Sequence, residues 1–378
     1  MSPGRRFVAG ALAVTTIVAA FAACDRGAVS PPRAPTPEPA ASTPEPAAST
    51  PEPAASTPHA VGAPPSGPRA PAPVLGAVHA DAPVARAGHF VSLDVDDDAW
   101  QQRVRVAVPL RFKPVGTSSV VFKTTFVGGL EASFRPRTST QANGWTNEVA
   151  AYRVARALDL DQVPPAVARA FSRAELQARL HPDYAADWPA LDEKMLGHGD
   201  VVWGALVYWV PGLRDLELDT PRGMARWGQW LSRDSGALSP DEASLAADVG
   251  TMLCFDYLIA NVDRWSGGNV RADASARRVV IRDHNLAFLA PLPRSQHERV
   301  LGPMRRVERF SRRFVIALQA LDEPRLRAAL APDASLPEGT PLLDEAQLRG
   351  VLDRRAALLS RVAALLDAYG DAAVLAFP

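Results

Sequence analysis

Hydrophobic and polar positions form regular patterns from about residue 90 to the C-terminus. Alternating or continuous apolar positions predict strands over Arg103–Val108 and Ser118–Val127, and a turn at Gly128-Gly129 leads into a third extended stretch, Glu131–Arg137. Val202–Val210 is a further strand-like run. The first half of this region is therefore expected to hold a small sheet that contains an antiparallel hairpin.

Apolar residues recur at helical spacing in one segment of the first half and through most of the second half. The predicted helices are Thr146–Leu158, with Thr146 as its N-cap, Leu245–Ala260, Phe310–Leu321 and Ala346–Ala368. A strand-rich first half with one helix, followed by a mostly helical second half, indicates an α+β fold.

The N-terminus has the pattern of an export signal. Arg5-Arg6 precedes an apolar run from Phe7 to Ala23 that is too short to span a bilayer comfortably as a helix. Ala22-Ala23-Cys24 resembles a bacterial lipobox, so we expect a lipoprotein-type signal peptide over residues 1–23, cleavage before Cys24 and lipidation of its thiol. The alternative is an ordinary secretory signal with Cys24 incidental.

Residues 24–89 are expected to form a disordered Pro/Ala-rich tether. Thr36–Ser56 consists of three copies of Thr-Pro-Glu-Pro-Ala-Ala-Ser, and the tether has almost no large apolar side chains. Burial therefore cannot offset the entropy of ordering the chain, and frequent Pro keeps it extended. The simple interpretation is a spacer that holds a globular region away from a membrane.

Composition excludes several classes of function. Lys and Arg total 41 and Asp and Glu total 41, so the formal net charge is zero and binding to nucleic acid is not expected. The two cysteines, Cys24 and Cys254, cannot form a disulfide framework and lack metal-ligand spacing. The three lysines, Lys113, Lys123 and Lys194, do not follow glycine, which excludes a P-loop.

Three acidic residues stand where apolar elements end or turn. Asp263 follows the apolar segment Phe255–Val262, Asp283 follows the strand-like Arg278–Arg282, and Glu148 lies in the helix after the glycine turn. A strand that leads into Asp283, 20 residues after Asp263, predicts a hairpin that brings both carboxylates to one mouth. Carboxylate oxygens are ligands that hard divalent cations prefer.

Four segments, in this order along the chain, resemble the secretory-pathway kinases of the Golgi casein kinase and four-jointed type. The similar segments are Thr146–Tyr152 with Val163-Pro164-Pro165 (its helix-C segment), Val202–Pro211 (its hinge strand), Phe255–Arg264 (its catalytic loop) and Ile281–Phe288 (its metal-binding loop). The resemblance implies a two-lobed protein-kinase-like fold, with an N-lobe over residues 90–210, a C-lobe over residues 211–378 and nucleotide bound between them.

The resemblance also implies roles for individual residues. Asp263 would accept or orient the proton of the attacking hydroxyl, and Asp283 and Glu148 would hold Mg²⁺ or Mn²⁺ on the phosphates of ATP. The further candidates are Asn269 as a metal ligand, and Lys123, Gly128, Gly129, Arg135 and Trp209 in nucleotide binding. Arg135, in Phe134-Arg135-Pro136, replaces the nucleotide-binding Lys of the family, which changes the geometry available to phosphate.

The predicted function is transfer of the γ-phosphoryl group of ATP to a Ser/Thr hydroxyl, or a sugar hydroxyl, of an exported substrate. The preponderance of Arg over Lys is typical of GC-rich codon usage and indicates a bacterium, so we expect a lipid-anchored protein of the cell envelope. The expected partners are nucleotide, a protein or glycan acceptor and a membrane. Two alternatives remain open: a pseudokinase interaction module, and a nucleotidyl transferase that holds ATP in the reverse orientation. The oligomeric state is left open.

Other noticeable residues have structural interpretations. Asp256 is expected to be a hydrogen-bond acceptor on a buried helix, and Cys254 a small core residue. The arginines of Arg305–Arg313 recur at three- and four-residue steps, which favours one solvated helix face, or otherwise a patch for an acidic substrate or headgroup.

Overall fold

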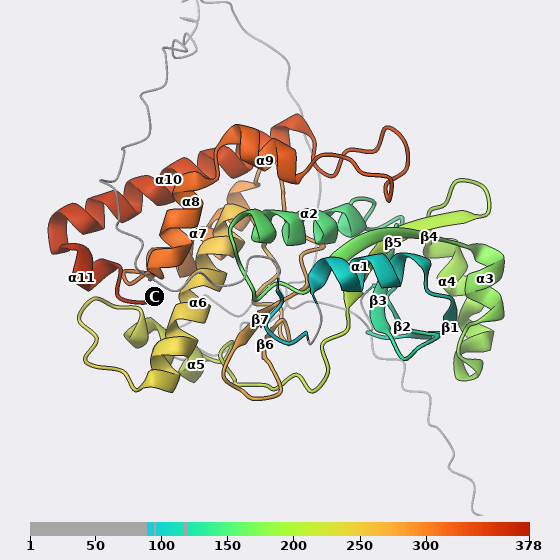
Figure 1. The fold of residues 1–378 in the computed structure, drawn as a ribbon, viewed down its shortest axis with the longest axis horizontal. Helices are drawn as coiled ribbons and strands as arrows, with labels where there is room; N and C mark the ends of the chain where they lie inside the picture. Colours follow the sequence, from blue (N-terminus) through green and yellow to red (C-terminus); the bar gives the residue numbers. More distant parts are fainter. Residues whose placement is uncertain (1–88, 94–95, 117–118) are drawn as a thin grey trace, which may run out of the picture. The chain divides into compact units, whose positions relative to one another are not determined.

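The computed structural model describes residues 89–378, apart from 94, 95, 117 and 118 (Figure 1). The predicted signal peptide, the Cys24 lipidation site and the tether up to residue 88 lie outside the described residues. The elements are α1 (Asp97–Val106), β1 (Pro109–Pro114), β2 (Phe122–Phe126), β3 (Glu131–Pro136), α2 (Gly144–Ala157), β4 (Ala166–Ser172), α3 (Arg173–Ala178), the 3₁₀ helix η1 (Pro182–Asp187), α4 (Trp188–Lys194), β5 (Val201–Tyr208), α5 (Pro221–Trp230), α6 (Pro240–Leu258), β6 (Val270–Ala272), β7 (Val279–Ile281), α7 (Arg294–Arg305), α8 (Arg312–Ala320), α9 (Glu323–Ala329), α10 (Glu345–Tyr369) and α11 (Asp371–Val374).

The N-lobe contains a five-stranded antiparallel sheet with strand order β1-β2-β3-β5-β4. Alternation along the strands sends aromatic rings to one face, where Phe112, Phe122, Phe134 and Phe171 pack with centroids 4.9–6.4 Å apart. A Cβ on Gly204 of β5 would lie 2.4 Å from the ring of Phe134, so this position requires glycine.

The predicted strand Arg103–Val108 is wrong, because most of it is the C-terminal part of α1. The side chain of Asp96 caps this helix by accepting hydrogen bonds from the N–H groups of Asp98 and Ala99. Trp100 and Val104, one helical turn apart, are buried, whereas Val106 is 79% exposed. The alternation of Arg and Val in this segment therefore has no relation to a sheet, and the first strand is β1.

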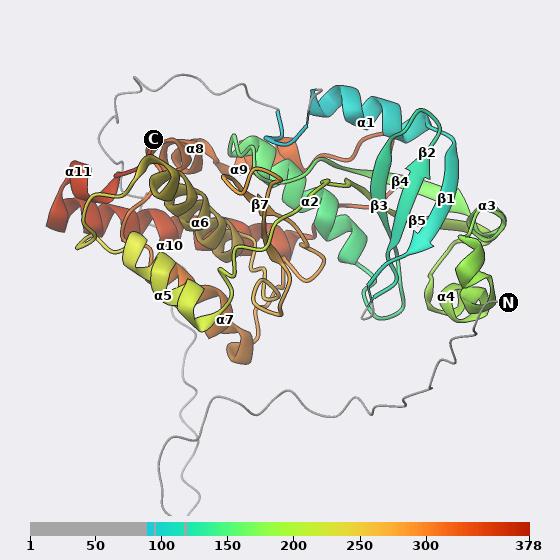
Figure 2. The same cartoon turned by 90° about the horizontal axis from the view of Figure 1, so that it is seen from below.

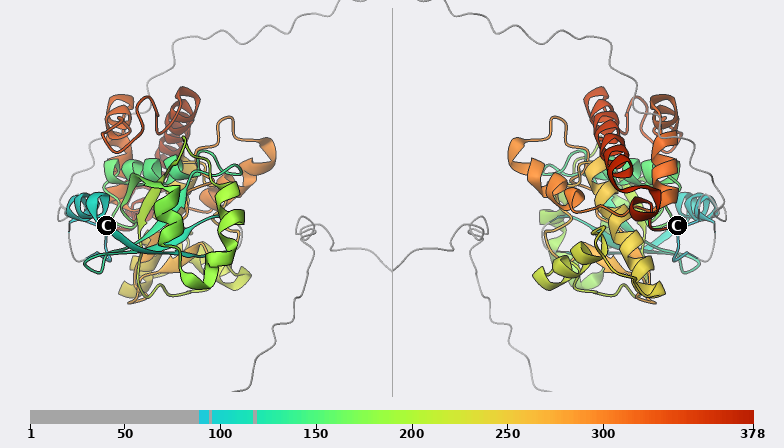
Figure 3. Two further views of the ribbon diagram at one scale, coloured as in Figure 1. Left: turned by 90° about the vertical axis from the view of Figure 1, so that its right-hand side faces the viewer. Right: turned by 90° about the vertical axis from the view of Figure 1, so that its left-hand side faces the viewer.

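The C-lobe is helical and is organised around α6. Its C-terminal half is buried, and α6 packs against α5, α7, α10 and the short strand β7. Figure 3 shows the long α10 beside α8 and α6 in the right-hand view. The capping box between Ser239 and Glu242 fixes the start of α6, five residues before the predicted Leu245.

Helix α2 connects the two lobes. Figure 2 shows it between the sheet and the C-lobe helices. Its apolar residues, such as Trp145, Val149 and Val154, belong to the same buried cluster as α6. The helix begins at Gly144 with Asn143 at the N-cap, so the prediction of Thr146 as N-cap is wrong, and the Thr146 hydroxyl donates to the Asn143 carbonyl from within the first turn.

The α+β fold class and the two-lobed arrangement are confirmed, with a sheet in one lobe and helices in the other. The arginines of Arg305–Arg313 do not share one helix face, because α7 ends at Arg305 and α8 begins at Arg312. None of the helices in the described part of the chain is both long and apolar enough to cross a bilayer.

Candidate functional site

A cavity of about 650 Å³ lies where the two lobes meet. The N-lobe contributes the β1–β2 loop, β3, α2 and the end of β5, and the C-lobe contributes the loops that follow α6 and β7. The polar residues that line it include Ser119, Arg135, Gln141, Glu148, Asp263, Ser266, Asn269, Arg282, Asp283 and Asn285. The structure thus brings three acidic residues that are far apart in sequence to one opening.

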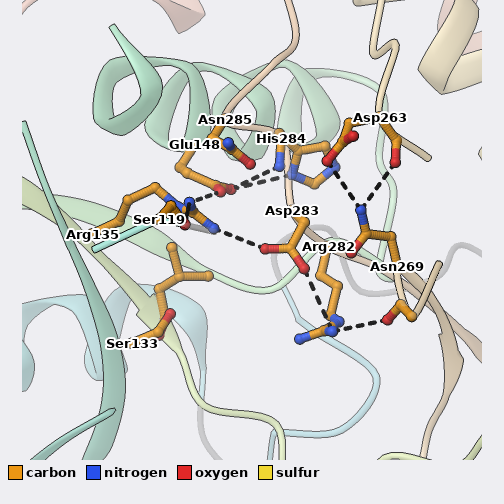
Figure 4. A network of polar contacts seen from close by, with 12 residues as sticks. Ser119, Ser133, Arg135, Glu148, Asp263, Asn269, Arg282, Asp283, His284 and Asn285 are labelled. Atoms are coloured by element: carbon orange, nitrogen blue, oxygen red, sulfur yellow. Dashed lines mark hydrogen bonds and ion pairs between the residues drawn. The ribbon is translucent and has the colours of Figure 1, made fainter. Parts of the chain in front are cut away.

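Three different elements present these acids (Figure 4). Glu148 lies in the first half of α2 and is 4% exposed. Asp263 follows the end of α6, and Asp283 follows β7 in the left-handed backbone region, with φ of 60°. Non-glycine residues adopt this region at a cost, which neighbouring contacts must hold in place. Here the Asn261 amide donates to the Asp283 carbonyl at 3.3 Å.

Arg135 on β3 connects the two lobes at the bottom of the cavity. Its Nε lies 3.1 Å from Glu148 Oε1, and its Nη2 lies 2.9 Å from Asp283 Oδ1. A third nitrogen, Nη1, donates to the Ser119 hydroxyl of the β1–β2 loop at 3.4 Å. Because a guanidinium presents several donors in a fixed plane, this one side chain can contact acceptors on three segments at once.

The charge of Glu148 is stabilised from two sides. Burial alone would raise the pKa of its carboxyl, but hydrogen bonding from His284 and the positive charge of Arg135 together lower that pKa to about 2. The backbone N–H of His284 donates to Glu148 Oε2 at 3.2 Å. Glu148 is therefore ionised at neutral pH and bonded to the residue that follows Asp283.

Arg264 holds together the two loops that carry Asp263 and Asp283. It is 1% exposed and bonds Asp256 through Nε at 2.7 Å and Nη2 at 2.9 Å. Its Nη1 donates to the carbonyls of Asn269 and Arg282. Asp256 is thus the structural acceptor that the sequence predicts, whereas the central position of Arg264 was not predicted.

Asp263 and Asn269 contact each other. The Asn269 amide donates to the Asp263 carbonyl at 3.0 Å and to Asp263 Oδ2 at 3.3 Å. The amide nitrogen is therefore engaged with Asp263, and both residues line the cavity. Asn269 therefore fixes the Asp263 carboxylate at the wall of the cavity.

Some of the predicted nucleotide-binding residues lie elsewhere. Gly128 and Gly129 form the β2–β3 turn, and neither they nor Lys123 lines the cavity. Lys123 pairs with Glu131 at 2.8 Å and lies over the ring of Trp209, which does line it. Trp203 lines a second cavity of about 560 Å³ together with Trp145.

The sequence analysis missed the β1–β2 loop. Gly116 and Ser119 of this loop line the cavity, and Ser119 contacts Arg135. A cluster of Gly, Thr and Ser between two apolar stretches was the available signal. Asn147 was missed as well: its amide donates to the carbonyls of Asn285 and Ala287, both at 3.0 Å.

Comparisons with solved structures identify proteins that have a similar fold. No protein-family model matches the chain, and no curated protein matches its sequence. The solved structure of the Golgi casein kinase with Mn/ADP bound matches at TM-score 0.56 and 17% identity, over 76% of this chain and 80% of that chain. A second structure of the Golgi casein kinase matches at TM-score 0.57 and 17% identity, over 76% of this chain and 79% of that chain. Hydra Fam20 with sugar matches at TM-score 0.56 and 15% identity, over 76% and 95%.

The chain shares the fold of these kinases. The likeness that the four motifs predicted is confirmed at this level.

The donor set at the cavity fits a hard divalent cation. Within the described part of the chain, no three His, Cys, Asp or Glu side chains lie close enough together to hold a metal ion by themselves. Mg²⁺, however, is usually held in proteins by one or two carboxylates together with substrate phosphates and water. Glu148 and Asp283 supply two such carboxylates, and Asn269 supplies an amide oxygen.

Proposed function

We propose that the chain is a metal-dependent phosphotransferase that moves the γ-phosphoryl group of ATP to a hydroxyl group. The observation that carries the proposal is the convergence of Glu148, Asp263 and Asp283, from three separate segments, on one cavity that Arg135 and Trp209 also line. Positioning and charge neutralisation are what phosphoryl transfer requires of a protein, and this cavity provides groups for both.

Each residue has a specific part in this proposal. The Asp263 carboxylate, oriented by Asn269, accepts or orients the proton of the acceptor hydroxyl. Arg135 and the β1–β2 loop bind phosphate oxygens, and Trp209 with Leu286 and Pro164 forms an apolar wall for the base. Mg²⁺ or Mn²⁺, held by Glu148 and Asp283 with Asn269, would neutralise charge on the phosphates.

The acceptor is proposed to be a Ser/Thr hydroxyl of an exported protein, or a sugar hydroxyl of a glycan. The N-terminal pattern supports an extracytoplasmic location, with lipidation of Cys24 as the anchor in a bacterial cell envelope. Mass analysis of the purified membrane-associated protein tests the anchor, because a lipidated chain begins at Cys24 and an ordinary secreted chain carries no acyl mass there.

A thermal-shift titration with ATP and Mn²⁺ tests the nucleotide site. A ligand that binds only the folded state stabilises it by about 2.7 kcal/mol at a hundred times its dissociation constant, so the melting temperature should rise with ligand concentration. Asp283→Asn should remove the rise. Asp241→Asn, an exposed acid remote from the cavity lining, should leave it unchanged.

Chemistry is tested separately from binding. Asp263→Asn should keep the ATP-induced rise in melting temperature but lose phosphate transfer to an acceptor. No rise at millimolar nucleotide in the wild type would contradict the proposal and support the interaction module. An acceptor that gains AMP instead of phosphate would support nucleotidyl transfer.

A further inference from the structure

Arg135 occupies the two carboxylates that the proposed function assigns to the metal ion. Its contacts to Glu148 Oε1 and Asp283 Oδ1, at 3.1 and 2.9 Å, are those of close ion pairs. The side chain is only 11% exposed, so water screens these contacts weakly. A divalent ion that binds the same oxygens must therefore compete with a resident positive charge.

The remaining carboxylate oxygens also have positively polarised neighbours. Glu148 Oε2 accepts from the backbone of His284, and Asp283 Oδ2 lies 3.5 Å from Arg282 Nη2 (Figure 4). The negative charge of the two acids is thus balanced by the chain itself. Such a pair has little electrostatic attraction left for a metal ion that arrives alone.

The contacts that hold Glu148 near the loop of Asp283 do not involve Arg135. Glu148 lies on α2, which packs on β3, β4, β5 and α9, and Asn147 next to it bonds the carbonyls of Asn285 and Ala287. The backbone N–H of His284 donates to Glu148 itself. The guanidinium can therefore leave the acids without disturbing these contacts.

We propose that Arg135 is a built-in counter-ion that excludes the divalent cation until nucleotide phosphates take over the guanidinium. Phosphate oxygens offer Arg135 a bidentate partner, which releases the oxygens of Glu148 and Asp283 for the metal. Metal and nucleotide then bind with positive coupling, each raising the affinity for the other. The role of the nucleotide in this inference rests on the proposed function, whereas the exclusion of the metal does not.

Exclusion is tested with Mn²⁺ alone, by electron paramagnetic resonance of the free ion in titrations of the full chain. The wild type should show no saturable site up to millimolar Mn²⁺. Arg135→Met should gain a site that binds at least about tenfold tighter. Adding Asp283→Asn to Arg135→Met should abolish the gain. Arg137→Met is the matched control, because Arg137 is an exposed arginine just past the same strand and no ion pair involves it among the described residues.

Wild type and Arg135→Met that bind Mn²⁺ equally well, or equally poorly, would overturn the exclusion. Circular dichroism first establishes that the variant is folded. Should Arg135→Met not fold, the ¹⁵N resonance of Arg135 Nε in the wild type decides the question. Arg135→Lys, which keeps the positive charge, identifies this resonance by its absence. Mg²⁺ alone should leave this resonance in place, and Mg²⁺ with ADP should shift it.

A shift with Mg²⁺ alone would overturn the inference, because the metal would then displace the guanidinium without help. No shift with ADP would contradict the nucleotide site of the proposed function and with it the coupling. The response of the resonance to Mg²⁺ alone, and the Mn²⁺ titrations where Arg135→Met folds, would still decide whether Arg135 excludes the metal, so the two failures are distinguishable.

Discussion

Arg264 is the single residue that most directly fixes the distance between the catalytic and metal-binding loops of the proposed site. Its guanidinium pairs with Asp256 on α6 and reaches the carbonyls of Asn269 and Arg282 on the two loops. Burial alone would lower the pKa of Arg264, but the Asp256 charge raises it above its ordinary value. The residue therefore stays charged, and no other side-chain shape offers the same set of donors.

We expect Arg264→Lys to destabilise the protein by about 2–3 kcal/mol, because lysine keeps the charge but cannot make the bidentate pair and both carbonyl contacts. Urea unfolding of the variant and the wild type measures the difference. Arg277→Lys is the control: Arg277 is 71% exposed and lies 4.0 Å from Asp241, so its free energy of unfolding should change little. Equal effects of the two substitutions would contradict the role of Arg264.

Cys254 provides a second prediction for a single residue. Burial raises the pKa of its thiol to about 12. At about pH 8 the folded chain should carry thiolate at this position in only about one molecule in ten thousand. Iodoacetamide should therefore label the peptide that contains Cys254 after denaturation but not before, as measured by mass spectrometry. Rapid labelling of the native chain at Cys254 would show that the α6 core opens readily.

Helix α1 shows how an element outside the sheet supports α2, and through it Glu148. The Asp97 carboxylate is 2% exposed and accepts hydrogen bonds from the Phe90 N–H, the Tyr152 hydroxyl and Arg156. Tyr152 and Arg156 lie one turn apart on α2. Asp97 therefore ties the N-terminal segment, α1 and α2 together.

Asp97→Ala should lower the stability by about 2 kcal/mol, because it leaves a buried N–H and a buried hydroxyl without their acceptor. The neighbouring acid gives a matched control: Asp98 is 65% exposed and lies 3.8 Å from Arg156. Asp98→Ala should change the free energy of unfolding by no more than about 0.5 kcal/mol. The melting temperatures of the three proteins report the order, and similar losses for both variants would refute this account of α1.

Elements with a strong local signal could be predicted from sequence, and those without one could not. The helix predicted over Leu245–Ala260 and the sequence segments around Asp263 and Asp283 each contain several informative residues at fixed spacing. Strand β1, bounded by Pro109 and Pro114, offers little periodicity, and the Arg-Val alternation of α1 imitates a strand. The ion pair between Arg135 and Asp283 joins residues 148 positions apart, so no local pattern contains it.

At the scale of the whole described region, side chains that reach from one lobe to the other hold the site together. Helix α2 packs on β3, β4 and β5 of the sheet and on α9 of the helical lobe. Arg135 reaches from the sheet to Asp283, while Asn147 reaches from α2 to the loop that follows Asp283. The position of Glu148 relative to the loop of Asp283 therefore depends in part on Asn147, which touches neither nucleotide nor acceptor in the proposed reaction.

Asn147→Ala should cost about 2 kcal/mol of stability, because the carbonyls of Asn285 and Ala287 lose their donor inside the protein. The rise in melting temperature on adding ATP and Mn²⁺ should also be smaller than in the wild type, and by more than the lower stability accounts for. The reason is that the loop that carries Asp283 is less well held. Asn143→Ala, one turn earlier, removes an exposed side chain that makes no capping hydrogen bond. Its melting temperature and its response to ATP and Mn²⁺ should match the wild type. An Asn147 variant that is destabilised but keeps the full ligand response would limit Asn147 to a structural role, and the contacts of Arg135, Glu148 and Arg264 would then suffice to hold the loop after β7.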